Sequence, residues 1–292
     1  MLTNNAILVR FSVGGWGATK YDKKITQEVE DRHGKKGEIG RFNKQLADKK
    51  YLTELSSNIS MARKFHYQQT MPWLDADGIR ILPTVNFIRY QEGMSEFHSK
   101  HIAALDKFKS IFSDLIEEAR YRLGDKFNLR EYPSLSAVLE RYRWILTFSP
   151  VPESGDFRVD LDKETIQEIE KEMKDRLASS YDGAVLDLFE RIHTQTSHMA
   201  ERLENYTGGK EGSFRDSLID NTIELSALLP SLNITGNAKL NELARRIDQD
   251  LCQYQADVLR ENDLARKDVA LQAKSIAQDA ADIAKSMGAL FA

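Results

Sequence analysis

Hydrophobic residues recur at steps of three and four along most of the chain, a spacing that places them on one face of an α-helix. The longest such pattern covers residues 166–206, and its mean step of about 3.6 residues is the period of a straight α-helix. At 1.5 Å per residue, this helix would be about 60 Å long. Asp162 stands where an N-terminal cap is expected, and Gly208 and Gly209 are expected to end the helix.

The remainder of the second half also has helical spacing. The pattern predicts a short helix over 214–229, ended by Pro230, and a further helical region over 237–258. Beyond a break at 262–263 the apolar positions follow a seven-residue repeat, which is typical of a coiled coil. So narrow an apolar seam needs a partner, either the long helix or another copy of the chain. We predict self-association through this seam, with these contact residues: Val269, Ile276, Ile283, Met287 and Leu290.

The first half has a mixed pattern. Three stretches alternate or are rich in β-branched and aromatic residues, and they predict a small, three-stranded sheet over 7–13, 144–148 and 157–161. Helices are expected at 22–32 and 42–68, from Gly93 to Gly124, and after Ser134. Pro83 is expected in the first turn of the helix that follows it. The expected fold class is therefore mainly α: an α+β N-terminal region with a small sheet over 1–161, and long helices forming a hairpin or coiled-coil-like assembly arm over 162–292.

The N-terminal and C-terminal parts of the chain also differ in net charge. Residues 1–66 hold 13 Lys/Arg against 7 Asp/Glu, whereas residues 151–292 hold 17 against 27, within a net charge of -4. Such an asymmetry indicates an interaction surface. The basic first third also contains aromatic residues, and single-strand nucleic acid binders use that combination. The candidate contacts are Trp16, Lys20, Lys23, Lys24, Arg32, Lys35, Lys36 and Arg41. A surface that binds an acidic protein partner is the other interpretation of this segment.

Cysteine usage and hydropathy bear on the compartment. Cys252 is the single cysteine, which fits a reducing compartment, and the N-terminal segment lacks the features of a signal peptide. No stretch approaches 18 consecutive apolar residues. We therefore expect a cytoplasmic location and no membrane partner.

Candidate catalytic groups are sparse. Glu96, His98 and His101 have a spacing that two helical turns could use to hold a metal, but His101 lies on the apolar face, which favours a core histidine. The carboxylates of Asp75, Asp77, Asp160 and Asp162 are more simply explained as turn and cap residues. The segment 14–20 does not have the spacing of a phosphate-binding loop. We therefore expect no metal, no cofactor and no enzymatic activity, with a metal-dependent hydrolase at His98 and His101 as the weaker alternative.

Several segments between residues 79 and 161 together carry a resemblance to a known family. They are the run Tyr132-Pro133-Ser134, the turn over 148–152, the stretch over 155–161 and the segment over 79–90. Across roughly residues 5–165 the chain resembles an uncharacterised family of helical proteins encoded by tailed bacteriophages. Some relatives lie in phage gene neighbourhoods with AAA-type ATPases or DNA-metabolism genes, so the resemblance implies a role in the cytoplasm of an infected bacterium.

Together these features favour a non-catalytic, phage-encoded interaction and assembly protein. Its oligomer would bind a protein partner, either a phage ATPase or a host defence factor, through helical surfaces. The alternative is a single-stranded nucleic acid binding protein of phage recombination or replication that acts through the basic N-terminal segment.

Overall fold

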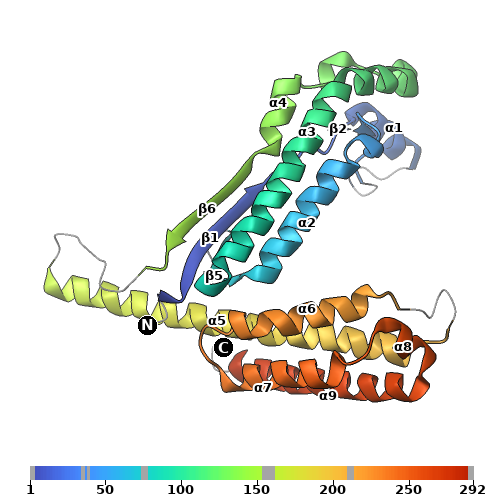
Figure 1. Ribbon diagram of the computed structural model, residues 1–292. Helices are drawn as coiled ribbons and strands as arrows, with labels where there is room; N and C mark the ends of the chain where they lie inside the picture. The colour runs from blue at the N-terminus through green and yellow to red at the C-terminus, as the bar shows by residue number, and fades with distance from the viewer. Residues whose placement is uncertain are drawn as a thin grey trace. The chain divides into compact units, whose positions relative to one another are not determined.

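The chain forms a mainly helical protein with a small sheet, as the computed structural model shows (Figure 1). The structure describes residues 4–33, 37, 40–73, 78–152, 162–208 and 214–288. The helices are α1 (Lys23–His33), α2 (Thr53–Gln69), α3 (Phe87–Leu123), α4 (Leu135–Leu139), α5 (Lys163–Glu204), α6 (Ser217–Leu232), α7 (Ala238–Arg246), α8 (Ala256–Glu261) and α9 (Asp263–Gly288). The strands are β1 (Ala6–Val13), β2 (Thr19–Tyr21), β3 (Asn43–Gln45), β4 (Met71–Pro72), β5 (Ile79–Pro83) and β6 (Trp144–Pro150). The predicted fold class is confirmed.

The main sheet has four strands in the described part of the chain, in the order β4-β5-β1-β6. β1 pairs antiparallel with β5, so that Ala6 lies opposite Pro83 and Arg10 opposite Ile79. The expected third strand over 157–161 lies outside the described residues. β5 pairs with β1, and its residues Ile81 and Leu82 are fully buried. Pro83 ends this strand and is not part of the next helix.

The residues group into two compact units, which differ from the expected division at residues 161 and 162. Unit 1 comprises residues 1–10, 66–90 and 147–292, and unit 2 comprises residues 11–65 and 91–146. The division falls within β1, α2, α3 and β6. Unit 1 holds 20 Lys/Arg against 29 Asp/Glu, and unit 2 holds 21 against 16. The two units therefore carry net charges of opposite sign, as the two parts of the sequence do.

Unit 2 is built around parts of α2 and α3. Its core contains Trp16, Leu55, Phe108 and Val138. α2 begins at Thr53 and not near residue 42, which corrects the predicted helix over 42–68. The reason is local: β3 pairs with β2, and the side chain of Asp48 then caps a short 3-10 turn over Lys49–Tyr51 by accepting a hydrogen bond from the Lys50 N–H.

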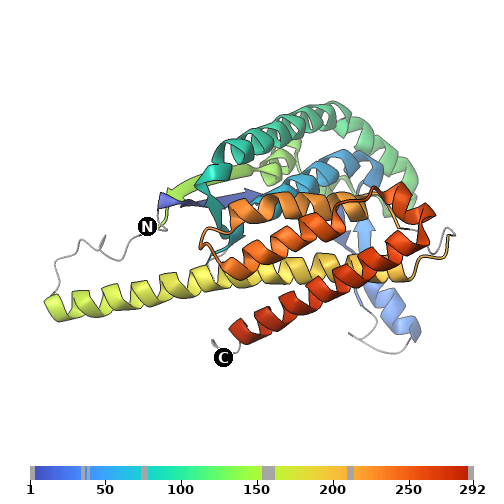
Figure 2. The same ribbon diagram turned by 60° about the horizontal axis from the view of Figure 1, so that its bottom comes forward.

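Unit 1 contains a bundle of four helices, α5, α6, α7 and α9 (Figure 2). α5 and α9 lie antiparallel, since Arg266 near the start of α9 contacts Tyr206 just beyond α5 and the Ala277 carbonyl lies 3.0 Å from Nδ1 of His193. The predicted long helix is confirmed, with the side chain of Asp162 accepting a hydrogen bond from the Thr165 N–H at 2.9 Å. Its apolar face is fully buried only from Ser180 onward, because the first turns of α5 extend beyond the other helices (Figure 2).

The other helices of unit 1 differ in detail from the expectation. α6 continues to Leu232, so Pro230 lies inside the helix instead of ending it. The helix predicted over 237–258 is divided into α7, a π-helical turn over Ile247–Leu251, and α8. Asn262 caps α9, where its side-chain oxygen accepts hydrogen bonds from the N–H groups of Leu264 and Ala265.

Within the described ranges, no helix combines the length and the apolar character that crossing a bilayer requires.

Candidate functional site

The sequence-predicted basic residues of unit 2 gather around a two-stranded ribbon formed by β2 and β3. Tyr21 lies opposite Asn43 in this ribbon, and α1 begins two residues later with Asp22 as its cap. Tyr21 and Phe42 are each 44% exposed, and the Arg41 guanidinium carbon lies 5.8 Å from the centre of the Tyr21 ring. Four further contact candidates or neighbours are also exposed on or beside the ribbon: Lys20, Lys23, Lys24 and Asn43. We call this surface, comprising Lys20, Tyr21, Lys23, Lys24, Arg41 and Phe42, the ribbon surface.

A buried lysine holds the ribbon in place. The Lys44 ammonium lies 2.7 Å from a Glu131 carboxylate oxygen and 3.6 Å from one of Asp22, and it donates a hydrogen bond to the Lys126 carbonyl at 2.9 Å. The backbone N–H of Ile25 and the charge of Lys44 keep the pKa of the Asp22 carboxyl below its usual value. Lys44 is therefore an internal counter-ion and does not belong to the ribbon surface.

Two of the predicted contact residues, Trp16 and Arg32, do not join the ribbon surface, and two more are not described. Trp16 is buried in the core of unit 2, with its ring centre 6.2 Å from that of Phe108 and 6.1 Å from that of Phe112. The prediction that Trp16 stacks on a ligand is therefore wrong, because its ring is needed for the core. Lys35 and Lys36 lie outside the described residues. Arg32 is exposed at the opposite end of α1.

The histidines on α3 pack as core and boundary groups. His101 is buried, and its Nε2 lies 3.1 Å from the Tyr142 carbonyl oxygen, so this nitrogen carries the proton and donates. The His98 ring stacks on Trp144 at 5.2 Å, and Glu96 pairs with Lys100 at 2.6 Å. Among the residues that the structure describes, no three metal-binding side chains come together. Glu96 and the Nε2 of His101 are thus engaged by other groups of the protein, and the hydrolase alternative stays a prediction.

The remaining candidate residues from the sequence either have a structural role or lie outside the residues that the structure describes. Asp162 caps α5, whereas Asp75, Asp77 and Asp160 are not described. Burial raises the pKa of the Cys252 thiol to about 11, so the thiol is protonated at neutral pH.

The predicted oligomerisation seam packs inside unit 1. Val269 and Ile276 are fully buried in the core that contains the inner face of α5. Ile283 and Met287 are partly buried against the same core, and Leu290 lies outside the described residues. Of the two partners that the sequence left open for this seam, the structure thus shows the long helix of the same chain. Val269 and Ile276 are consequently not accessible to a second copy.

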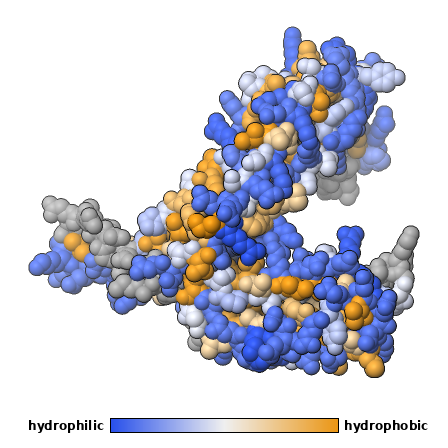
Figure 3. All heavy atoms as spheres, in the orientation of Figure 1, coloured by the Kyte–Doolittle hydropathy of each residue, from blue (hydrophilic) through white to orange (hydrophobic). Residues whose placement is uncertain are grey.

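A different face of α9 is exposed. Leu264 and Leu271 are 81% and 64% exposed, and they stand one heptad apart on the same side of the helix. Leu271 also borders a groove of about 360 Å³ between the end of α5 and the start of α9, lined by Leu203 and Ala270 among others. Figure 3 shows apolar side chains over α8 and the adjoining end of α9. We call Leu264, Leu271 and this groove the α9 surface; sequence reasoning missed it because the stronger repeat at Val269 and Ile276 masked the weaker one.

Comparison with known protein families, with curated proteins and with solved structures finds no significant match to this chain.

Proposed function

We propose that the chain is a non-catalytic interaction protein, encoded by a bacteriophage, that binds a protein partner through exposed helical surfaces of unit 1. The family resemblance favours a phage ATPase as the partner, and a host defence factor is the other partner class. The observation that carries the proposal is the α9 surface. Single exposed leucines are common, but two leucines one heptad apart beside a groove offer a partner helix a continuous contact.

Burial of this surface would favour binding. Covering a leucine side chain contributes about 1.5–3 kcal/mol relative to leaving it in water. Two leucines that begin 81% and 64% exposed therefore offer about 2–4 kcal/mol, compared with the roughly 8 kcal/mol of a micromolar complex. Self-association, which we also propose, would use the same surface, since the seam at Val269 and Ile276 is already covered.

The test is affinity capture from infected bacteria with nuclease present, followed by quantitative mass spectrometry. We expect the double variant Leu264→Glu/Leu271→Glu to recover at least tenfold less of the partner than the wild type, because it places two charges in the contact. Leu129→Glu changes a leucine that is also exposed but lies in unit 2, and it should leave recovery unchanged. Equal recovery by the wild type and the double variant would refute the proposal. Sedimentation velocity of the same proteins reports whether the surface also joins copies of the chain.

The ribbon surface favours a second candidate function, the binding of single-stranded nucleic acid. Lysine and arginine contact phosphates, and exposed rings such as Tyr21 and Phe42 stack on bases. Both kinds of side chain are exposed together on one short ribbon. The acidic residues of α1, Glu28 and Asp31 among them, oppose this function, so we place it second.

A titration of fluorescein-labelled oligothymidine tests this second function. Binding through Lys23, Lys24 and Arg41 predicts that log K falls with log salt with a slope of about -2, because each phosphate contact on a single strand adds about -0.7. The triple variant Lys23→Glu/Lys24→Glu/Arg41→Glu should abolish binding. Lys163→Glu/Lys171→Glu, on the exposed start of α5, should not change it. Binding that is independent of salt, or that survives the triple variant, would rule out the ribbon surface as a nucleic acid site.

A further inference from the structure

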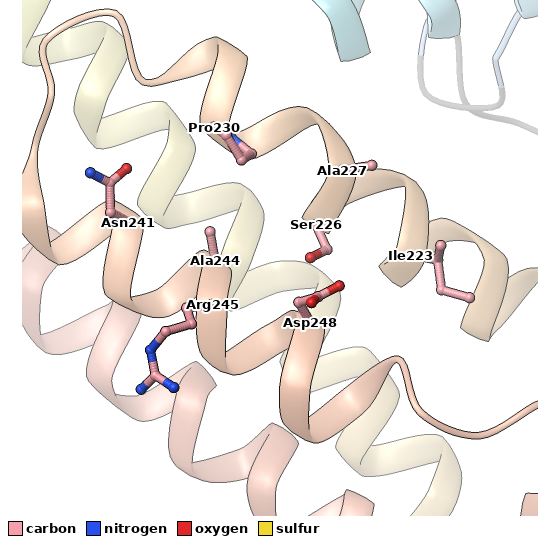
Figure 4. A pocket seen from close by; sticks show the side chains of 8 residues that line it. All are labelled: Ile223, Ser226, Ala227, Pro230, Asn241, Ala244, Arg245 and Asp248. Atoms are coloured by element: carbon pink, nitrogen blue, oxygen red, sulfur yellow. The ribbon is translucent and has the colours of Figure 1, made fainter.

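A second groove lies in unit 1, between α6 and α7 (Figure 4). Its volume is about 510 Å³, which is room for a long side chain and the residues on either side of it. The apolar part of its lining comes from small and aliphatic side chains, namely Ile223, Ala227, Pro230 and Ala244. Figure 3 shows that apolar side chains continue along α6.

Both helices that form this groove are irregular where they border it. Pro230 has no N–H, so the Ser226 carbonyl lacks the donor that an α-helix normally supplies from four residues ahead. Across the groove, the backbone over Ile247–Leu251 forms a π-helical turn, and Asp248 of this turn lines the groove. Irregular turns of this kind are frequent at binding sites because they free backbone groups and reposition side chains.

The charged residues that line the groove are Asp248 and Arg245. In the part of the chain that the structure describes, no cation pairs with the Asp248 carboxylate, which is exposed. Arg245 also lines the groove, but its guanidinium binds both carboxylate oxygens of Glu242, at 2.6 and 3.1 Å, and also contacts Gln249. Figure 4 shows this guanidinium turned away from α6. The groove therefore presents the Asp248 carboxylate, while the guanidinium of Arg245 beside it is held by Glu242.

We propose that this groove binds a lysine or arginine side chain of a protein partner. The cationic end would donate to the Asp248 carboxylate and the Ser226 carbonyl, and the methylene groups would lie against Ile223 and Ala227. Charge complementarity selects this occupant, because unit 1 as a whole carries 29 Asp/Glu against 20 Lys/Arg. The inference goes beyond the α9 surface and does not depend on it.

The test is a fluorescence anisotropy titration with a capped, labelled Leu-Lys-Leu-Lys-Leu peptide and its norleucine counterpart, in which norleucine replaces both lysines. We expect the full chain to bind the lysine peptide about tenfold more tightly, and Asp248→Asn to remove that difference. Asp220→Asn, which removes an exposed carboxylate of α6 outside the groove, is the matched control and should have no effect.

Pro230→Ala separates binding from folding. It returns a donor to the Ser226 carbonyl, so it should weaken binding of the lysine peptide about threefold while raising the melting temperature of the protein. Equal affinity for the two peptides, or equal effects of Asp248→Asn and Asp220→Asn, would overturn the inference. Either result would leave the proposed function intact, because that function is tested at Leu264 and Leu271.

Discussion

Replacing Lys44 with methionine is expected to destabilise unit 2 by about 3 kcal/mol. The methionine fills similar space but leaves the carboxylates of Glu131 and Asp22 close together without their shared cation. Removing one partner of a buried ion pair costs about 3–5 kcal/mol, and the lower end applies here because both carboxylates retain some contact with water. Urea denaturation followed by circular dichroism measures the change.

The matched control is Lys100→Met. Lys100 also pairs with a carboxylate, at 2.6 Å from Glu96, but both side chains are more than half exposed. Water and salt screen such a pair, so its loss should change the unfolding free energy far less. If the two variants were equally stable, the cluster around Lys44 would not be the anchor that holds the ribbon, and the ribbon surface would need another support.

Acid is expected to destabilise unit 1 through His66, by about 3 kcal/mol between pH 7 and pH 4. This buried ring lies 2.7 Å from the Tyr90 hydroxyl, and burial, with a smaller contribution from the charge of Arg80, lowers its pKa to about 4. The unfolded chain binds a proton at this histidine near its ordinary pKa of 6.5, whereas the folded protein does not. The stabilisation is therefore complete above pH 6.5 and is lost as the pH falls towards 4.

Urea denaturation of the wild type and His66→Gln across this range isolates the effect. Other groups titrate in both proteins, so the quantity of interest is the difference between their unfolding free energies. That difference should shift in favour of the variant by about 3 kcal/mol between pH 7 and pH 4. Tyr90→Phe removes the hydrogen bond but keeps the buried histidine, so it should lower stability at every pH and retain the acid dependence. A constant difference between the wild type and His66→Gln would show that the folded protein accommodates the protonated ring.

The long helices could be predicted because their apolar spacing is regular and their ends carry caps. Residues 163–204 form one helix directly after Asp162, and the short helix α4 follows Ser134, whose hydroxyl accepts a hydrogen bond from the Ala137 N–H. Spacing reports which side chains are buried but not which surface covers them. Val269 and Ile276 are accordingly buried as their seam position suggests, yet the covering helix comes from the same chain.

The candidate sites could be predicted less well, for the same reason. The sequence shows two cations, Lys44 and Lys23, and two aromatic residues, Trp16 and Tyr21. Only the fold shows that Lys44 and Trp16 are buried whereas Lys23 and Tyr21 are exposed. The groove at Asp248 depends on a proline inside α6 and a π-helical turn beyond α7. Neither feature has a periodic signal, so sequence reasoning placed a helix end at Pro230 and a continuous helix through Asp248.

Unit 1 draws its residues from three separate stretches of the chain, whereas all of unit 2 has been synthesised by residue 146. Domains generally fold as their residues leave the ribosome, so unit 2 can complete its core first. During that interval α5 emerges with Leu188 and Ile192 uncovered, because α9 follows much later. Nascent chains with such apolar helix faces aggregate readily and attract chaperones. A ribosome that pauses between α5 and α9 would therefore prolong the stage at which this protein is most vulnerable to misassembly.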